Sequence, residues 1–278
     1  MTNPIHIRTT AEALDYARQT SRTLFGEDLA PFAVKAFGDV EEMFAGHGSR
    51  FQAIDLKFHD LEHTLRAAVA MITVIAGMNR HSPDKPPVTK EYYDLGVAAV
   101  LFHDSGYLRP KGKKTGSGAT YTSIHVERSC KIIAEYFQDQ GLGHREQCVA
   151  GNMILCTGLN LDTGIIPFRS EPEKMAGYAL GTGDLLGQMA DPAYVGKLPH
   201  LFEEFAEARA HDPLDEVVPA FRTVEAMISN TPKFYRDYVL RIFDEQLGGV
   251  FRHVSEPYPQ GVNLYTQAIE ENIRQIEG

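Results

Sequence analysis

Two histidines in the segment FHDLEH, His59 and His63, have the spacing of side chains that can share one reactive site. Positions four apart lie on the same face of a helix. Both imidazoles can therefore serve as metal ligands, or one can bind a metal while the other donates a proton. Taken alone, the pair is equally compatible with two solvated histidines on a surface helix.

A His-Asp pair, His103 and Asp104, stands at the end of the apolar run GVAAVLF. A buried imidazole and an ionised carboxylate are costly unless a metal or another partner compensates them. The segment GTGDLLGQMAD poses the same problem, because Asp184 lies within an apolar stretch that predicts a helix. These buried polar positions are hard to explain without a metal or a partner group.

The elements that must position these side chains are helices, because apolar residues recur with a helical period along the chain. Ser, Thr or Asp before several apolar runs, and Gly after them, mark helix starts and stops. Predicted helices cover 11–25, 31–45, 60–78, 90–104, 121–140, 144–157, 173–190, 192–210, 214–229, 231–247 and 263–277. The segment 248–262 is a short hairpin or a coil. The sequence therefore predicts an all-α domain with about ten helices.

The composition limits the class of protein. The 278 residues are 43% hydrophobic and 23% charged, which suffices for a sizeable core. A net charge of -10 is unsuited to a nucleic acid polymer, whose binding depends on Lys and Arg. A small anionic substrate remains compatible with this charge, because a bound metal reverses the local field.

No secretory or membrane segment is expected. The N-terminal sequence MTNPIHIRTT lacks the basic region and the apolar core of a signal peptide. The longest apolar stretch, 67–78, is too short to cross a bilayer as a helix. Three cysteines without a CxxC motif indicate reduced thiols. These features predict a cytoplasmic protein with no membrane partner, and they leave a homo-oligomer open.

The order of the motifs, a His, then His-Asp, then an Asp on successive helices, resembles the HD-domain metal-dependent phosphohydrolases over about residues 50–195. The resemblance implies a single domain, 1–278, whose HD core is flanked by N-terminal helices at 10–45 and a C-terminal helical extension at 196–278. It implies hydrolysis of a small phosphorylated substrate, such as a phosphodiester or a nucleotide.

The resemblance also assigns roles to individual residues. The metal ligands that it implies are His63, His103, Asp104 and Asp184. Asp104 is the natural bridge if two ions bind. His59 matches the histidine that protonates the leaving oxygen in cyclic-nucleotide phosphodiesterases, whose HNxxH motif is similar to FHDLEH with Asp60 in place of Asn.

The expected cofactor is one or two divalent metal ions. Mixed imidazole and carboxylate ligation suits Mn, Fe, Co, Ni or Zn, and a bridging carboxylate also allows Mg. Such an ion lowers the pKa of a bound water and so supplies hydroxide to attack phosphorus. A positioned histidine can then donate a proton to the departing oxygen.

One position departs from the phosphodiesterase pattern. Tyr107 stands three residues after the HD aspartate, where those enzymes carry another His. This difference weakens the match to their second metal and to a cyclic-nucleotide substrate. His125 is a candidate replacement ligand, and the alternative is that it pairs with Glu127 at a helix start.

A basic, Gly-rich loop follows the HD motif closely. Its cations are Arg109, Lys111, Lys113 and Lys114. A Gly-rich backbone can move over a ligand, and Lys can neutralise a phosphate, so the loop is expected to contact the substrate. A solvated charged loop is the alternative of equal weight.

Two other functions stay open. A mixed-valent di-iron oxygenase of the HD type needs two more histidines before the final Asp. His125 supplies one, but VAGNMILCTG contains none, and His144 lies upstream in an expected loop. A non-catalytic nucleotide-binding sensor would be expected to lose ligands, whereas this chain retains the set. Hydrolysis is therefore the leading hypothesis.

Overall fold

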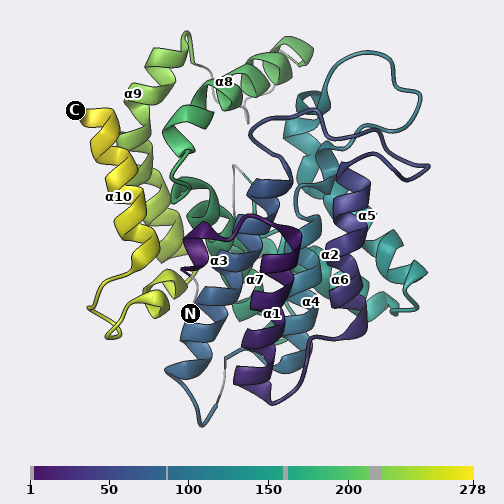
Figure 1. Ribbon diagram of the computed structural model, residues 1–278, viewed down its shortest axis with the longest axis vertical. Coiled ribbons are helices and arrows are strands. Elements are labelled where there is room, and N and C mark those ends of the chain that lie inside the picture. The colour runs from purple at the N-terminus through teal and green to yellow at the C-terminus, as the bar shows by residue number, and fades with distance from the viewer. Residues whose placement is uncertain (1–2, 86, 159–161, 213–220) are drawn as a thin grey trace.

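The regular elements of the chain are helices (Figure 1). The computed structural model describes residues 3–85, 87–158, 162–212 and 221–278. The α-helices are α1 (Thr10–Phe25), α2 (Pro31–Phe44), α3 (Leu61–Arg80), α4 (Lys90–Phe102), α5 (His125–Asp139), α6 (His144–Ile154), α7 (Glu171–Met189), α8 (Tyr194–His211), α9 (Val224–Phe234) and α10 (Leu264–Glu277). Within the described ranges no strand forms, and the two isolated bridges join Phe51 to Pro110 and Glu256 to Val262. The predicted all-α class is confirmed.

Helices α3 and α7 occupy the centre of the molecule (Figure 1). Helices α1, α2, α4, α5 and α6 lie to one side of this pair, and α8, α9 and α10 lie to the other. Helix α3 packs against α1, α4 and α7, while α7 also packs against α6 and α10. The C-terminal helices are thus joined to the central pair through α10.

Helix α3 is buried on almost every side. All of its residues from His63 to Ile72 are buried, including Arg66, which donates to the carbonyl of Ile5 and pairs with Asp191 at 3.2 Å. By length and composition α3 could cross a membrane, but 78% of that stretch is buried inside the fold. A helix that is apolar all round and enclosed by other helices is a core helix.

The backbones of α3 and α7 touch where they cross. A Cβ added to Gly183 would lie 2.5 Å from the Met71 nitrogen, and one added to Gly187 would lie 2.7 Å from the Ala67 nitrogen. No side chain fits at such distances, so both positions require glycine. Because Asp184 directly follows the first of these glycines, the crossing holds its carboxylate beside α3.

A buried glutamate fixes the start of α7. Glu173 is 0% exposed and accepts hydrogen bonds from Asn152 Nδ2 on α6, at 2.8 Å, and from the Arg169 nitrogen, at 3.0 Å. Ser170 caps the helix, because its hydroxyl accepts from the Glu173 nitrogen. Together these contacts anchor α7 to α6 and set its position along the core.

The C-terminal half differs from the sequence prediction. The predicted helices 214–229 and 231–247 have no break between them: α9 runs through that point and continues into π turns within 235–246. Pro232 lies inside α9 and lacks the N–H that an α-helical hydrogen bond needs, and the wider π turns follow it directly. Residues 214–220 of the first predicted helix lie outside the described residues.

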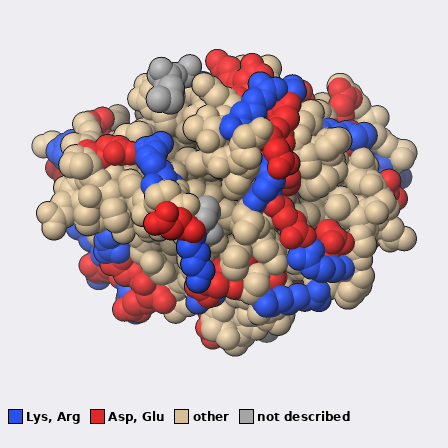
Figure 2. Space-filling view, turned by 90° about the horizontal axis from the view of Figure 1, so that it is seen from below, with Lys and Arg blue, Asp and Glu red and all other residues tan. Residues whose placement is uncertain are grey.

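The surface carries mixed charges. Figure 2 shows a face on which Lys and Arg alternate with Asp and Glu over short distances, without a broad patch of one sign. Exposed ion pairs such as Arg236 with Glu277 and Arg252 with Asp244 are of this kind. On this face, the net charge of -10 is not gathered into a single acidic surface.

Candidate metal centre

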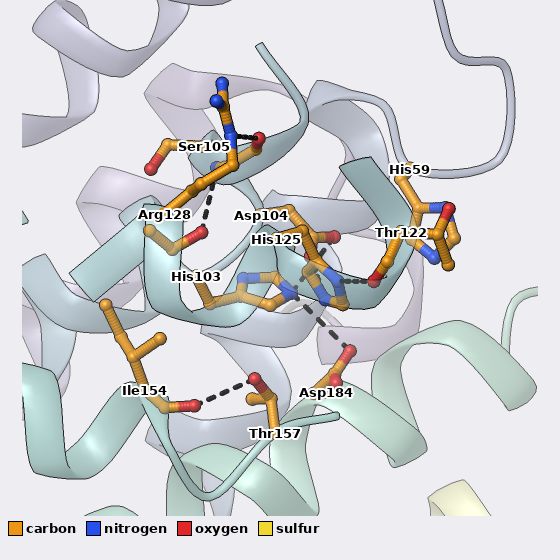
Figure 3. Close-up of polar contacts among 12 residues, drawn as sticks. His59, His103, Asp104, Ser105, Thr122, His125, Arg128, Ile154, Thr157 and Asp184 are labelled. Carbon is orange, nitrogen blue, oxygen red and sulfur yellow. Dashed lines mark hydrogen bonds and ion pairs between the residues drawn. The ribbon is translucent and has the colours of Figure 1, made fainter. Parts of the chain in front are cut away.

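Four side chains that are far apart in the sequence meet in a buried cluster. His63 Nε2 lies 3.2 Å from His103 Nε2 and 3.0 Å from Asp104 Oδ2. Asp184 Oδ1 lies 3.3 Å from His63 Nε2 and 3.5 Å from His103 Nε2. Figure 3 shows His103, Asp104 and Asp184 pointing toward one another. The structure therefore brings together all four ligands that the sequence resemblance implied.

The start of α3 presents His63. Asp60 is the N-cap, and its Oδ1 accepts a hydrogen bond from the His63 nitrogen at 2.8 Å. His59 consequently precedes the helix, so the shared helical face predicted for the two histidines does not exist. The capping turn still keeps the two imidazoles close, with ring centroids 5.7 Å apart.

The buried end of α4 presents His103 and Asp104, which are 1% and 3% exposed. The helix leading to them is buried from Tyr92 to Phe102. His103 Nδ1 donates to the carbonyl of Val100 at 2.7 Å, so its Nε2 carries a lone pair toward the cluster. The predicted burial of this His-Asp pair is confirmed, and the hydrogen bond fixes which nitrogen can bind a metal.

The donor atoms of the cluster suit a cation. Lone pairs of two imidazoles and two carboxylates face one another, which is unfavourable unless a proton or a metal ion lies among them. Asp104 Oδ2 is buried and lies 3.0 Å from His63 Nε2 and 3.2 Å from His103 Nε2. The ligand atoms of His63, His103 and Asp184 all lie within 4.8 Å of one another. This donor set is one that Mn, Fe, Co, Ni and Zn favour.

In the absence of a metal, the two imidazoles hold protons and the two carboxyl groups are ionised. Burial opposes the charged form of His63, but hydrogen bonds with Asp104 and Asp184 raise its pKa to about 9. The same carboxylates raise the pKa of His103 in spite of its burial. The two imidazoles in turn lower the pKa of both carboxyl groups, again against the effect of burial. The cluster therefore attracts positive charge strongly.

Three aromatic rings stack beside the cluster. The ring of Tyr107 lies between those of His59 and His125, with centroid distances of 4.7 and 4.4 Å. Tyr107, which occupies the place of a phosphodiesterase histidine, is buried and separates the two imidazoles. The residue that departs from the phosphodiesterase motif thus lies as a ring between His59 and His125.

His125 is the first residue of α5, which begins after a 3-10 segment, Gly118–Ile124, and thus four residues later than predicted. Its Nδ1 donates to the carbonyl of Thr122 at 2.6 Å, and its Nε2 lies 3.8 Å from Asp104 Oδ1. Glu127 is exposed, whereas His125 is buried and faces the cluster (Figure 3). This orientation keeps His125 a candidate for a further ligand.

Glu204 on α8 is a site residue that no motif indicated. Its Oε2 lies 2.6 Å from His59 Nδ1, and its Oε1 accepts from the nitrogens of Lys57 and Phe58 at 3.0 and 2.8 Å. With Nδ1 engaged, Nε2 is the atom of His59 left for proton transfer. The sequence carries no sign of this role, because Glu204 stands in the acidic segment EEFAE and its burial, 6% exposed, is seen only in the structure. A carboxylate at such a position needs a partner.

A pocket with a volume of about 140 Å³ opens over the cluster. Its polar floor includes His59, Asp104 and Asp184, and its walls are built mainly by α7, α8 and α9. The C-terminal helices therefore have a direct part in the site, because without α8 and α9 the floor would face open solvent.

The basic loop lies outside this pocket, since none of its four cations is a lining residue. Arg109 pairs with Asp55 at 2.9 Å, and Lys111 donates to a backbone carbonyl at 3.0 Å. Lys113 lies 4.3 Å from the centre of a tyrosine ring, and Lys114 is exposed. The predicted substrate-contacting cations thus do not line the pocket above the cluster.

The fold and the site together define an all-α protein with a buried cluster of histidines and aspartates under an open pocket. The chain belongs to the Npun_R2479-like family, whose model matches residues 111–256. The matched range includes His125, Asp184 and Glu204, but it begins after His63 and His103. No curated protein is significantly similar to the chain.

Proposed function

We propose that the chain is a metal-dependent phosphohydrolase of the HD type, acting on a small phosphoester. The observation that carries this proposal is the convergence of His63, His103, Asp104 and Asp184 on one buried point below an open pocket. Two imidazoles with two carboxylates would hold a divalent ion in an anionic setting. When bound, the ion would supply an acidified water nucleophile and neutralise charge on the phosphoryl oxygens.

His59 is the proposed general acid. It lines the same pocket, and its hydrogen bond with Glu204 fixes the orientation and the tautomer of the imidazole. The ring stack on Tyr107 restrains it from one face. A histidine held in this way can deliver a proton from Nε2 to a departing oxygen, which is the step that a phosphoester with a poor leaving group needs.

The oxygenase alternative lacks its remaining ligand. His144, which was expected in a loop, is instead the first residue of α6, the helix that should carry this ligand. It is exposed, and its ring nitrogens lie 3.6 and 3.7 Å from Cys148 Sγ. Among the described lining residues, the histidines are His59, His63 and His125. A hydrolytic site needs no histidine beyond those already near the cluster, so hydrolysis is the simpler proposal.

The test combines metal analysis with a hydrolysis panel of a phosphodiester and a phosphomonoester, each with Mn, Co, Ni, Zn and Mg. The wild-type chain is expected to bind a divalent ion and to hydrolyse at least one ester. Asp104→Ala should lose both properties. Asp94→Asn is the matched control, because Asp94 is also a buried carboxylate on α4 but pairs with Lys90, away from the cluster. Full activity in Asp104→Ala would contradict the proposal.

A further inference from the structure

The walls of the pocket differ sharply from its floor. Helix α8 contributes Leu198, Leu201 and Phe205, and α9 contributes Met227 and Phe234. The three α8 residues recur at a helical spacing, so they present one continuous apolar face. Phe221 completes this wall at the N-terminal side of α9. A ligand whose phosphoryl group reaches the floor must place the rest of its body against this apolar surface.

The pocket has no cation of its own among the residues that the structure describes, because none of those lining it is Lys or Arg. The undescribed segments next to lining residues, 159–161 and 213–220, also contain neither residue type in their sequence. Arg222 follows the lining residue Phe221 but is exposed and is not part of the lining. The floor itself carries the carboxylates of Asp104 and Asp184.

These charges limit how much anionic charge a ligand can bring. A metal ion at the cluster can neutralise one phosphoryl group. Further phosphates would meet apolar side chains, carboxylates and the neutral polar groups of Gln188, Asn230 and Thr231, with no Lys or Arg among the described lining residues to pair with them. Sites that bind several phosphates use such cations or clustered backbone N–H groups. An apolar organic group, in contrast, binds more tightly as it buries more apolar area against the walls.

From this combination we infer that the pocket selects a phosphoester with a single phosphoryl group and an apolar, preferably aromatic, organic group. This inference rests on the proposed phosphohydrolase function and narrows its substrate class. Nucleoside polyphosphates are excluded from that class, because their additional phosphates have no counter-charge in the pocket. The reaction is an ordinary hydrolysis: water adds to phosphorus, the ester P–O bond breaks, and the organic alcohol leaves with a proton.

The test measures binding rather than turnover. The Mn-loaded full-length chain is titrated calorimetrically with methylphosphonate, butylphosphonate, phenylphosphonate and tripolyphosphate. Affinity should rise from the methyl to the phenyl compound by about tenfold or more, as expected for added apolar burial. Tripolyphosphate should bind no more tightly than methylphosphonate. Equal affinities across the phosphonates, or tight binding of tripolyphosphate, would overturn the inference.

Variants locate the effect. Phe221→Ala should weaken binding of phenylphosphonate several-fold and leave methylphosphonate unchanged. Phe251→Ala is the matched control, because Phe251 is a half-buried ring that stacks on Phe243 outside the pocket, and it should change neither affinity. Arg222→Ala should also change neither; a loss of phosphonate binding would instead indicate recognition by charge and count against the inference.

The outcomes separate this inference from the proposed function. If the protein binds no divalent ion and hydrolyses no ester, the proposed function is wrong, and the inference about its substrate is wrong with it. A chain that binds the ion and hydrolyses esters, but prefers triphosphates over aryl phosphates, leaves the function standing and removes only the inference about its substrate.

Discussion

His63 Nε2 and His103 Nε2 lie 3.2 Å apart, although forty positions separate the two residues in the sequence. Each imidazole is supplied by the end of a buried helix, the first at the start of α3 and the second just after α4. Two such nitrogens, with Asp104 and Asp184 beside them, form a set of donor atoms in which a divalent ion would take the place of protons.

Metal binding should stabilise the fold. An ion at 100 times its dissociation constant adds about 2.7 kcal/mol to the free energy of unfolding, if the unfolded chain does not bind it. Chelation should therefore lower the melting temperature of the wild-type chain, and Mn should restore it. His63→Ala should abolish the response to Mn. His47→Ala is the control, because His47 pairs with Glu42 at the surface. A response that survives in His63→Ala would place the ion elsewhere.

Metal binding should release protons. In the metal-free protein, the pKa of His63 is raised to about 9, so its imidazole is protonated at pH 7. This raised pKa stabilises the metal-free fold fully below pH 6.5, and that contribution is lost as the pH rises through about 9. A metal must displace the proton, so its apparent affinity should rise with pH between about 6 and 8. Titration calorimetry in two buffers of different ionisation enthalpy should detect the released proton, and identical heats would argue against it.

The hydrogen bond between His59 and Glu204 should support turnover without supporting metal binding. His59→Ala should retain the metal and lower kcat by about 10²-fold or more, as for loss of a general acid. Glu204 acts as a positioning residue, so Glu204→Gln should lower kcat with little change in KM and alter the pH profile of kcat. Glu203→Gln is the control, because its side chain is 69% exposed. Loss of metal in Glu204→Gln would point to a merely structural role.

The contact between α3 and α7 should tolerate no added methyl group at the crossing. Gly187→Ala is expected to lower the free energy of unfolding by about 1–3 kcal/mol, because the new Cβ would overlap the α3 backbone. It should also weaken metal binding, since α7 carries Asp184. Gly38→Ala on α2 has open space around it and should be neutral or stabilising by up to about 1 kcal/mol. Urea denaturation with metal titration compares the two variants, and equal stabilities would refute the close packing.

The basic loop should be dispensable for activity. None of its cations is among the described residues that line the pocket, and salt screens the interactions of exposed charges. Replacing Lys111, Lys113 and Lys114 together by Ala should therefore leave kcat/KM within about threefold of wild type. A tenfold increase in KM would instead indicate that the loop contacts the substrate, as its sequence suggests. Steady-state kinetics at two salt concentrations is the measurement.

The sequence indicated three of the four cluster residues, because each of them stands in or beside an apolar run. His103 and Asp104 end an apolar run, and Asp184 interrupts another, so each stood out as a polar group that needed a partner. The order of these motifs and the helical period then predicted an all-α protein with the residues on separate helices. Those features depend on patterns within short segments of the sequence, which can be recognised without knowing how the helices pack.

Of the pair formed by His59 and Glu204, the sequence indicated only His59. His59 was indicated by its spacing from His63, yet Asp60 caps α3 and leaves His59 before the helix. Glu204, which holds the His59 imidazole, lies 145 positions away and belongs to no motif. Its partner is fixed by how α8 packs near the start of α3, and no local pattern of residues carries that information.

What the sequence determined by itself was the helical class and the position of His103, Asp104 and Asp184 in or beside apolar runs, because helix periodicity and the cost of burying charge are local properties. Only the tertiary structure decided which of them meet. The glycine contact between α3 and α7 brings Asp184 to the cluster, and the packing of α8 and α9 encloses the pocket and leaves the basic loop outside it. Distances between helices follow from side-chain packing across the whole core, which spacing along the chain does not encode.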